Sequence, residues 1–239
     1  MSEPLPTLLV PGLLATARLY AAQIPVLWQF GPVMLADHRR DDSMAAIARR
    51  ILDQAPPRFA LLGLSMGGYI AFELLRQAPA RIARLALLDT TARPDTAEQS
   101  ARRRTLIEHS HAGGFGQVAD LLYPGLVHPD RLGDAGLREQ VRCMAAETGA
   151  EAFIRQQTAI MHRRDSLPDL AAIGCPTLVL VGDADQLTPP ERAQEIAAGI
   201  RGAQLVVVPA SGHLSTLEQP DRVNAALVDW LGTTGDAIE

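Results

Sequence analysis

The sequence contains no lysine, so its positive side chains are 22 arginines. Schiff-base catalysis and pyridoxal-phosphate attachment both require a lysine amine, and both are therefore excluded. Cysteine is also scarce, because Cys143 and Cys175 are too few for a disulfide framework and lack the spacing of metal ligands. We therefore expect no cofactor and no bound metal.

Long apolar runs and an excess of positive charge are missing as well. No segment approaches the length needed to cross a bilayer, and residues 1–12 have no positively charged region before their short apolar run. The formal net charge is −5 and the longest basic run is Arg102-Arg103-Arg104, which argues against nucleic acid as a partner. We expect a soluble cytoplasmic protein that acts on a small molecule and binds neither membrane nor nucleic acid.

Short apolar runs alternate with amphipathic segments along most of the chain. With 239 residues, 47% of them hydrophobic, the chain is long enough for one large domain with a substantial core. The pattern predicts strands at 7–10, 33–36, 59–62, 85–88, 177–181 and 205–208. Because helical segments separate them, we expect an α/β fold with a mostly parallel, doubly wound sheet of about six strands.

Residues 92–174 interrupt this alternation. They contain stretches with helical apolar spacing and no convincing strand, and the segment is far longer than an ordinary connection. We interpret it as a helical cap inserted after the fourth strand, with residues 1–91 and 175–239 forming the core. A helix is also expected over 15–29, interrupted at Pro25.

A G-x-S-x-G sequence, Gly63-Leu64-Ser65-Met66-Gly67, joins the third predicted strand to a helix that ends before Pro79. This arrangement is the nucleophile elbow, a tight turn that strains the serine backbone and exposes its Oγ. The two glycines flank the turn because a Cβ at either position would collide with the neighbouring strand or helix. The position between a strand and a helix predicts that Ser65 is a nucleophile.

A serine nucleophile needs a base, which is oriented in turn by an acid. Only His213 both follows a core strand that comes after the serine and adjoins a glycine. His38 precedes the serine and lies among charged residues. The other histidines fall in the presumed cap, where we expect solvated or substrate-facing positions: His109, His111, His128 and His162. We predict that His213 is the base.

Three aspartates at strand ends compete for the role of the acid. Asp185 is best placed, because Gly182-Asp183-Ala184 can form the preceding turn. Asp183 fits a role in that turn through its own backbone hydrogen bonds. Asp89 ends the fourth strand and is the reserve candidate. We predict Asp185, which gives the chain order serine, acid, histidine.

These motifs resemble those of the α/β-hydrolase superfamily over nearly the whole chain. The resemblance rests on Pro11-Gly12-Leu13, residues 63–68, residues 182–185 with Pro189, and Ser211-Gly212-His213. It implies an α/β-hydrolase fold and an oxyanion hole formed by the backbone N–H groups of Leu13 and Met66. Two departures occur: Pro11-Gly12 replaces the usual His-Gly, and the family's D-x-R-G-x-G-x-S loop is degraded at 37–43.

The resemblance implies a serine hydrolase that cleaves a small or medium carboxylic ester through an acyl-enzyme, as carboxylesterases do. Apolar residues flank the predicted catalytic positions and suggest an apolar entrance, with Leu14, Leu187 and Leu214 as candidate substrate contacts. Acidic and basic residues nearly balance over 90–175, so no strong field is expected to select a charged substrate.

Other activities share the predicted triad and remain open alternatives. The run from Leu88 to Pro94 is similar to enol-lactonases of aromatic catabolism, which would place Arg93 near a carboxylated lactone. Carbon–carbon bond hydrolases, the elimination enzymes of menaquinone synthesis and cofactor-free perhydrolases also keep the triad. A ligand-binding receptor built on the same fold is an alternative outside enzymes.

Overall fold

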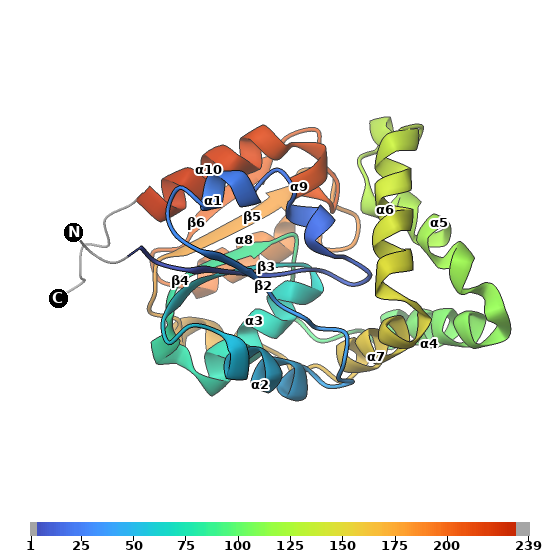
Figure 1. Ribbon diagram of the computed structural model, residues 1–239, viewed down its shortest axis with the longest axis horizontal. Coiled ribbons are helices and arrows are strands. Elements are labelled where there is room, and N and C mark those ends of the chain that lie inside the picture. The colour runs from blue at the N-terminus through green and yellow to red at the C-terminus, as the bar shows by residue number, and fades with distance from the viewer. Residues whose placement is uncertain (1–3, 233–239) are drawn as a thin grey trace.

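The computed structural model describes residues 4–232 and contains one sheet of six parallel strands in the order β2-β1-β3-β4-β5-β6 (Figure 1). The strands are β1 (Thr7–Val10), β2 (Val33–Leu35), β3 (Phe59–Leu64), β4 (Ile82–Leu88), β5 (Thr177–Gly182) and β6 (Gln204–Val208). Helices cover both faces, which confirms the predicted doubly wound parallel sheet.

Each face of the sheet has its own hydrophobic core. Along β3, Leu61 belongs to the core on the face covered by α2 (Met44–Gln54), α3 (Met66–Gln77) and α8 (Pro190–Gly199), whereas its neighbour Leu62 belongs to the core on the opposite face. That opposite face is covered by α1 (Ile24–Leu27) and α10 (Pro220–Gly232) (Figure 1). Because both faces are buried, β3 reads as a continuous apolar run rather than an alternating one.

The main differences from the predicted elements lie near the N-terminus and in β4. Instead of one interrupted helix over 15–29, the chain forms a 3₁₀ turn at Ala17–Tyr20 and the short α1, with Pro25 in its first turn. Proline has no N–H to donate and therefore starts a helix better than it continues one. β4 begins at Ile82, three residues before the predicted start, because Ala83 and Arg84 are only partly buried and interrupt the apolar run.

Four helices occupy the segment between β4 and β5, which holds no strand: α4 (Ala97–His109), α5 (Phe115–Leu126), α6 (Ala135–Thr148) and α7 (Ala150–Met161). They lie together at the end of the sheet (Figure 1), and we call them the cap helices. A π-helical turn at Ser110–Gly114 joins α4 to α5. Their buried residues, such as Tyr123 and Phe153, belong to the same cluster as sheet residues, so the cap helices share a core with the sheet.

The remaining short helix, α9 (Ser215–Glu218), follows the loop after β6. Over residues 4–232, none of the helices combines the length and the hydrophobicity that crossing a bilayer would require.

Candidate active site

Ser65 lies in a strained turn between β3 and α3, with φ 56° and ψ −115°. Its backbone is held from β4 and the following loop, because Ser65 N–H donates to Leu88 O at 2.9 Å and Thr90 Oγ1 donates to Ser65 O at 2.8 Å. A Cβ on Gly63 would collide with Gly67 O, and one on Gly67 would collide with Val10 O. Glycine at both positions therefore permits the tight turn that raises the Ser65 side chain out of the sheet.

The side chains of Ser65, His213 and Asp185 form a continuous chain of contacts. His213 Nε2 lies 2.8 Å from Ser65 Oγ, and His213 Nδ1 lies 2.8 Å from Asp185 Oδ2. The other oxygen of Asp185 accepts hydrogen bonds from the backbone N–H groups of Leu187 (2.9 Å) and Thr188 (3.0 Å). The carboxylate is thus fixed by the turn in which it lies, and it fixes the imidazole in turn.

Electrostatics within the pair favour a charged imidazole beside a charged carboxylate. Burial disfavours the imidazolium, but the carboxylate of Asp185 outweighs it and raises the pKa of His213. Burial likewise disfavours the carboxylate, but the His213 charge and the hydrogen bonds from His213 and Thr188 lower the pKa of Asp185. The pair therefore stabilises a proton that arrives on His213.

Asp89, the reserve candidate for the acid, takes a different position. It is fully buried and accepts hydrogen bonds from Ser215 Oγ at 2.5 Å and Gly182 N at 3.0 Å. Burial, together with the nearby charge of Asp185, raises the pKa of Asp89 to about 8. Among the described residues, its hydrogen bonds go to Ser215 and Gly182 and not to the imidazole of His213.

The neighbouring Asp183 joins two loops rather than closing its own turn. Its Oδ1 accepts a hydrogen bond from the backbone N–H of Ser211 at 3.1 Å, which ties the loop after β5 to the loop that carries His213. The predicted role in the turn therefore becomes a contact between loops. No local sequence pattern indicates this contact, because Asp183 and Ser211 follow different strands.

The loop after β1 passes directly against Ser65. A Cβ on Gly12 would lie 3.3 Å from Ser65 Cβ, and Leu13 lines the same cavity as Ser65. The loop is anchored by two residues that the sequence analysis did not assign: His38 Nε2 donates to Gly12 O at 2.9 Å, and Gln156 Oε1 accepts from Leu14 N at 3.2 Å. Burial lowers the pKa of His38, as suits a neutral ring that holds a carbonyl group.

Ser65 and His213 open into a cavity of about 310 Å³ between the sheet and the cap helices. The predicted apolar contacts Leu14, Leu187 and Leu214 all line it, together with Leu13, whereas Met66, which follows Ser65, is fully buried and does not. Leu187 is 47% exposed, so it lies at the opening. Among the described histidines, only His213 lines this cavity.

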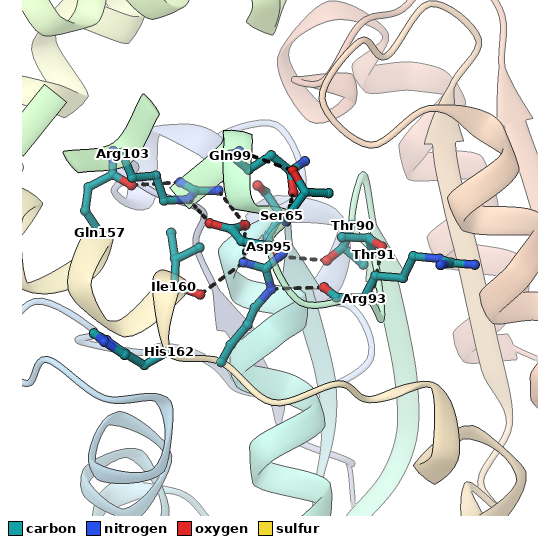
Figure 2. A network of polar contacts seen from close by, with 12 residues as sticks. Ser65, Thr90, Thr91, Arg93, Asp95, Gln99, Arg103, Gln157, Ile160 and His162 are labelled. Atoms are coloured by element: carbon teal, nitrogen blue, oxygen red, sulfur yellow. Dashed lines mark hydrogen bonds and ion pairs between the residues drawn. The ribbon is translucent and has the colours of Figure 1, made fainter. Parts of the chain in front are cut away.

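A polar cluster from the cap side also lines the cavity (Figure 2). Asp95 lies between Arg103 and Arg163, and Arg103 also contacts Gln157. Arg93, which the enol-lactonase resemblance would place near the substrate, points away from this cluster (Figure 2) and pairs with Glu195 of α8. That expectation is wrong for Arg93, because its guanidinium is held by Glu195 outside the described lining of the cavity.

The arginine run 102–104 carries no role that its local sequence predicts. The partners of Arg103 lie on α7 and in the loop after β4, and no local pattern identifies them. Only the folded arrangement of the cap helices brings these residues to the cavity.

Comparison with known proteins gives a consistent assignment. A family model described as "Alpha/beta hydrolase family" matches residues 7–226. A putative carbamate hydrolase, RutD, from Variovorax paradoxus (strain S110) is 28% identical, over 94% of this chain and 90% of that protein.

Two solved structures are similar over nearly the whole chain. A thermophilic esterase from Thermogutta terrifontis is 34% identical, with a TM-score of 0.86, over 95% of this chain and 89% of that one. An enol-lactonase from Burkholderia xenovorans LB400 has a TM-score of 0.87 over 97% of this chain and 93% of that one, and at 24% identity it shows the fold alone. With its parallel sheet, its serine turn and these matches over most of its length, the chain belongs to the alpha/beta hydrolase family.

Proposed function

We propose that the protein is a serine hydrolase that cleaves small or medium carboxylic esters through an acyl-enzyme. The observation that carries the proposal is the chain of two 2.8 Å contacts from Ser65 through His213 to Asp185, at the wall of a largely apolar cavity. Nucleophile, base and orienting acid at hydrogen-bond distance are the arrangement that acyl transfer requires.

The proposed reaction begins when Ser65 Oγ attacks the ester carbonyl while His213 Nε2 accepts its proton. Asp185 holds the imidazole through Nδ1 and stabilises the imidazolium. The backbone N–H groups of Leu13 and Met66 are the proposed donors to the oxyanion, and one such donor contributes about 3–4 kcal/mol in comparable enzymes. His213 then protonates the leaving alcohol, and a water molecule repeats the attack on the acyl-enzyme.

The size and lining of the cavity support a small or medium substrate. Its volume of about 310 Å³ is at the lower end of the range for small-molecule sites, roughly 300–1,000 Å³. Leu14, Leu187 and Leu214 are the proposed apolar contacts. We assign the closure of the cavity to residues 92–174 as a helical cap over the core formed by 1–91 and 175–239. The similarity to a solved esterase at 34% identity supports an ester as the substrate.

Carbamates are the second candidate substrates. The curated relative named as a putative carbamate hydrolase covers 94% of this chain, and the same serine chemistry applies to a carbamate carbonyl. Carbamates, enol-lactones and carbon–carbon substrates are assayed next if the wild type does not turn over the esters in the experiment below.

The test is pre-steady-state release of p-nitrophenol from acetate, butyrate and octanoate esters, with Ser65→Ala measured beside the wild type. We expect a burst followed by turnover, and loss of both in Ser65→Ala. Ser100→Ala, on α4 and outside the cavity lining, is the matched control and should behave as the wild type. Unchanged activity in Ser65→Ala would refute the nucleophile. Absence of turnover by the wild type would refute ester hydrolysis and direct the assay to carbamates, lactones and carbon–carbon substrates.

A further inference from the structure

The cavity beside Ser65 carries more positive than negative charge. Apart from His213, the charged residues among its described lining are Asp95, Arg102, Arg103 and Arg163. Asp95, with its side chain 1% exposed, lies between two guanidinium groups: its Oδ2 is 2.6 Å from Arg103 Nε and its Oδ1 is 2.5 Å from Arg163 Nη1. One carboxylate balances one guanidinium, so this cluster, in which Arg103 is partly exposed, retains one positive charge.

The excess positive charge is available to a ligand at the Arg103 guanidinium. Arg103 uses Nε for Asp95 and donates Nη1 to Gln157 Oε1 at 2.7 Å, whereas its Nη2 has one long contact, 3.4 Å to Asp95 Oδ1. Arg163 is more deeply held, because it also donates to the carbonyl groups of Arg93 and Ile160 and stacks on Tyr69 at 4.2 Å. The Arg103 guanidinium is therefore the group that remains able to receive an anion.

Gln157 provides an independent indication of a missing acceptor. Because Arg103 can only donate, its contact fixes Gln157 Oε1 on that side and turns the Nε2 amide away from it. Gln157 is completely buried, and Nε2 has no hydrogen-bond partner within the part of the chain that the structure describes. Buried donors are nearly always satisfied. Since Gln157 lines the cavity, an acceptor on a bound molecule would complete its hydrogen bonding.

Both groups share the cavity with the nucleophile. Figure 2 draws Ser65 with Asp95, Arg103 and Gln157, and all four line the same space of about 310 Å³. Most of the other lining residues are apolar, such as Leu106 and Ile160. The same cavity therefore offers a nucleophile, apolar walls and a polar cluster to one small molecule.

We propose that Arg103 and Gln157 form a carboxylate subsite, and that the natural substrates are esters or lactones that carry a free carboxylate. The inference rests on the proposed function, and it names the substrate class of that site. A guanidinium fork and an amide N–H match the oxygens of a carboxylate, and the single excess charge of the cluster matches a monoanion. Arg102, on the exposed side of the lining, adds a field that attracts an anion toward the opening.

The experiment compares esters that differ only in a carboxylate. The mono-p-nitrophenyl esters of succinate and glutarate are paired with p-nitrophenyl butyrate and valerate, and 3-carboxyphenyl acetate is paired with phenyl acetate. We expect the wild type to prefer the carboxylated member in at least one set. Arg103→Gln should lower kcat/KM for that ester by about 10- to 100-fold, as expected for one hydrogen bond to a charged group, and should leave the neutral ester within about threefold.

Two further variants show whether the effect of Arg103→Gln comes from the subsite. Gln157→Glu keeps an oxygen acceptor for Arg103, but it replaces the unpaired N–H donor and its negative charge cancels the excess positive charge. The variant should therefore fold and lose the preference for carboxylated over neutral esters. Arg104→Gln removes the same charge from an exposed position on α4 that does not line the cavity, and it should keep the preference.

A binding measurement separates this inference from the proposed function. Glutarate is titrated calorimetrically into Ser65→Ala, where no chemistry is needed, and we expect binding that Arg103→Gln weakens by about 10-fold or more in the same background. The subsite is refuted if neither set of esters shows a preference, or if both Arg103→Gln and Gln157→Glu leave it unchanged. Ester turnover that survives Ser65→Ala would instead refute the proposed nucleophile, while the titration still reports on the subsite.

Discussion

The side-chain oxygen of Gln156, in cap helix α7, accepts a hydrogen bond from the backbone N–H of Leu14, in the loop after β1, at 3.2 Å. Both residues are buried, and Leu14 has the positive φ of 57° that a non-glycine residue seldom adopts. A cap helix therefore helps to hold the loop that carries the proposed oxyanion donor at Leu13. The position of this loop depends on the cap helices as well as on the sheet.

Replacing Gln156 by methionine tests this relationship. The variant keeps the length of the side chain and removes the acceptor, so the loop loses one hydrogen bond worth about 0.5–1.5 kcal/mol. We expect kcat for p-nitrophenyl esters to fall by up to about 10-fold with little change in KM, because the loop acts on the oxyanion rather than on ground-state binding. A thermal melt monitors folding. An unchanged kcat would show that Gln156 does not position the loop.

The raised pKa of His213 predicts the acidic limb of the pH profile. His213 must be neutral to accept the Ser65 proton, so activity falls as pH drops through its pKa. Burial lowers that pKa and the Asp185 carboxylate raises it by more, so we expect the limb of kcat/KM in the wild type to lie above pH ~6.5, the unperturbed value for histidine. Asp185→Asn should shift the limb to lower pH and reduce kcat by about 10⁴-fold. A limb that stays in place in Asp185→Asn would contradict the assignment of the acid.

Asp89 predicts a pH dependence of stability. Between pH ~4, the unfolded value, and its folded pKa of about 8, Asp89 holds a proton in the folded state and loses it on unfolding. The free energy of unfolding therefore decreases as pH rises through this window and levels off above it. Asp89→Asn, which mimics the neutral acid, should lack this contribution. Urea denaturation at pH 5, 7 and 9 measures the free energy of unfolding of the wild type and of Asp89→Asn. The wild-type value minus the variant value should become more negative up to pH 8. A difference that stays constant with pH would argue that Asp89 is ionised throughout.

Gly67, in the elbow, and Gly116, in α5, should respond oppositely in stability to substitution by alanine. A Cβ on Gly67 would collide with Val10 O, so the strand and helix would have to separate, and we expect Gly67→Ala to destabilise the fold by about 3 kcal/mol or more. Gly116 lies inside α5 with no atom within 4 Å of an added Cβ. Gly116→Ala should therefore stabilise by up to about 1 kcal/mol through helix propensity. Urea denaturation measures both, and equal effects would contradict the packing argument.

Substitution of Arg93 is expected to leave the activity nearly unchanged. Its guanidinium is half exposed and paired with Glu195 outside the cavity lining, and exposed ion pairs contribute about 0–1 kcal/mol. We expect Arg93→Ala to change kcat/KM by less than about twofold for neutral and carboxylated esters alike, because surface pairs of this kind do not reach the site. A selective loss on carboxylated esters would restore the role that the enol-lactonase resemblance gave to Arg93.

Local patterns in the sequence determined the strands and the elbow of this protein. Continuous apolar runs predicted the strands because both faces of the sheet are buried, and Gly63 and Gly67 predicted the elbow because only glycine permits so close an approach of strand and helix. Parallel strands all end at the same edge, so the sequence also placed Ser65, Asp185 and His213 there; the structure brings them into contact, and their catalytic roles remain predictions for the experiments above.

Only the tertiary structure decided which side chains meet at that edge. Asp89 and Asp185 both end strands, and the choice between them depends on which carboxylate lies beside the imidazole and which lies beside Ser215. Arg103 contacts Gln157 and Leu14 contacts Gln156, and both glutamines belong to cap helix α7, far away along the chain. Backbone conformation follows from short sequence patterns, whereas contacts between distant side chains follow from how helices pack, and helix packing leaves no local signature in the sequence.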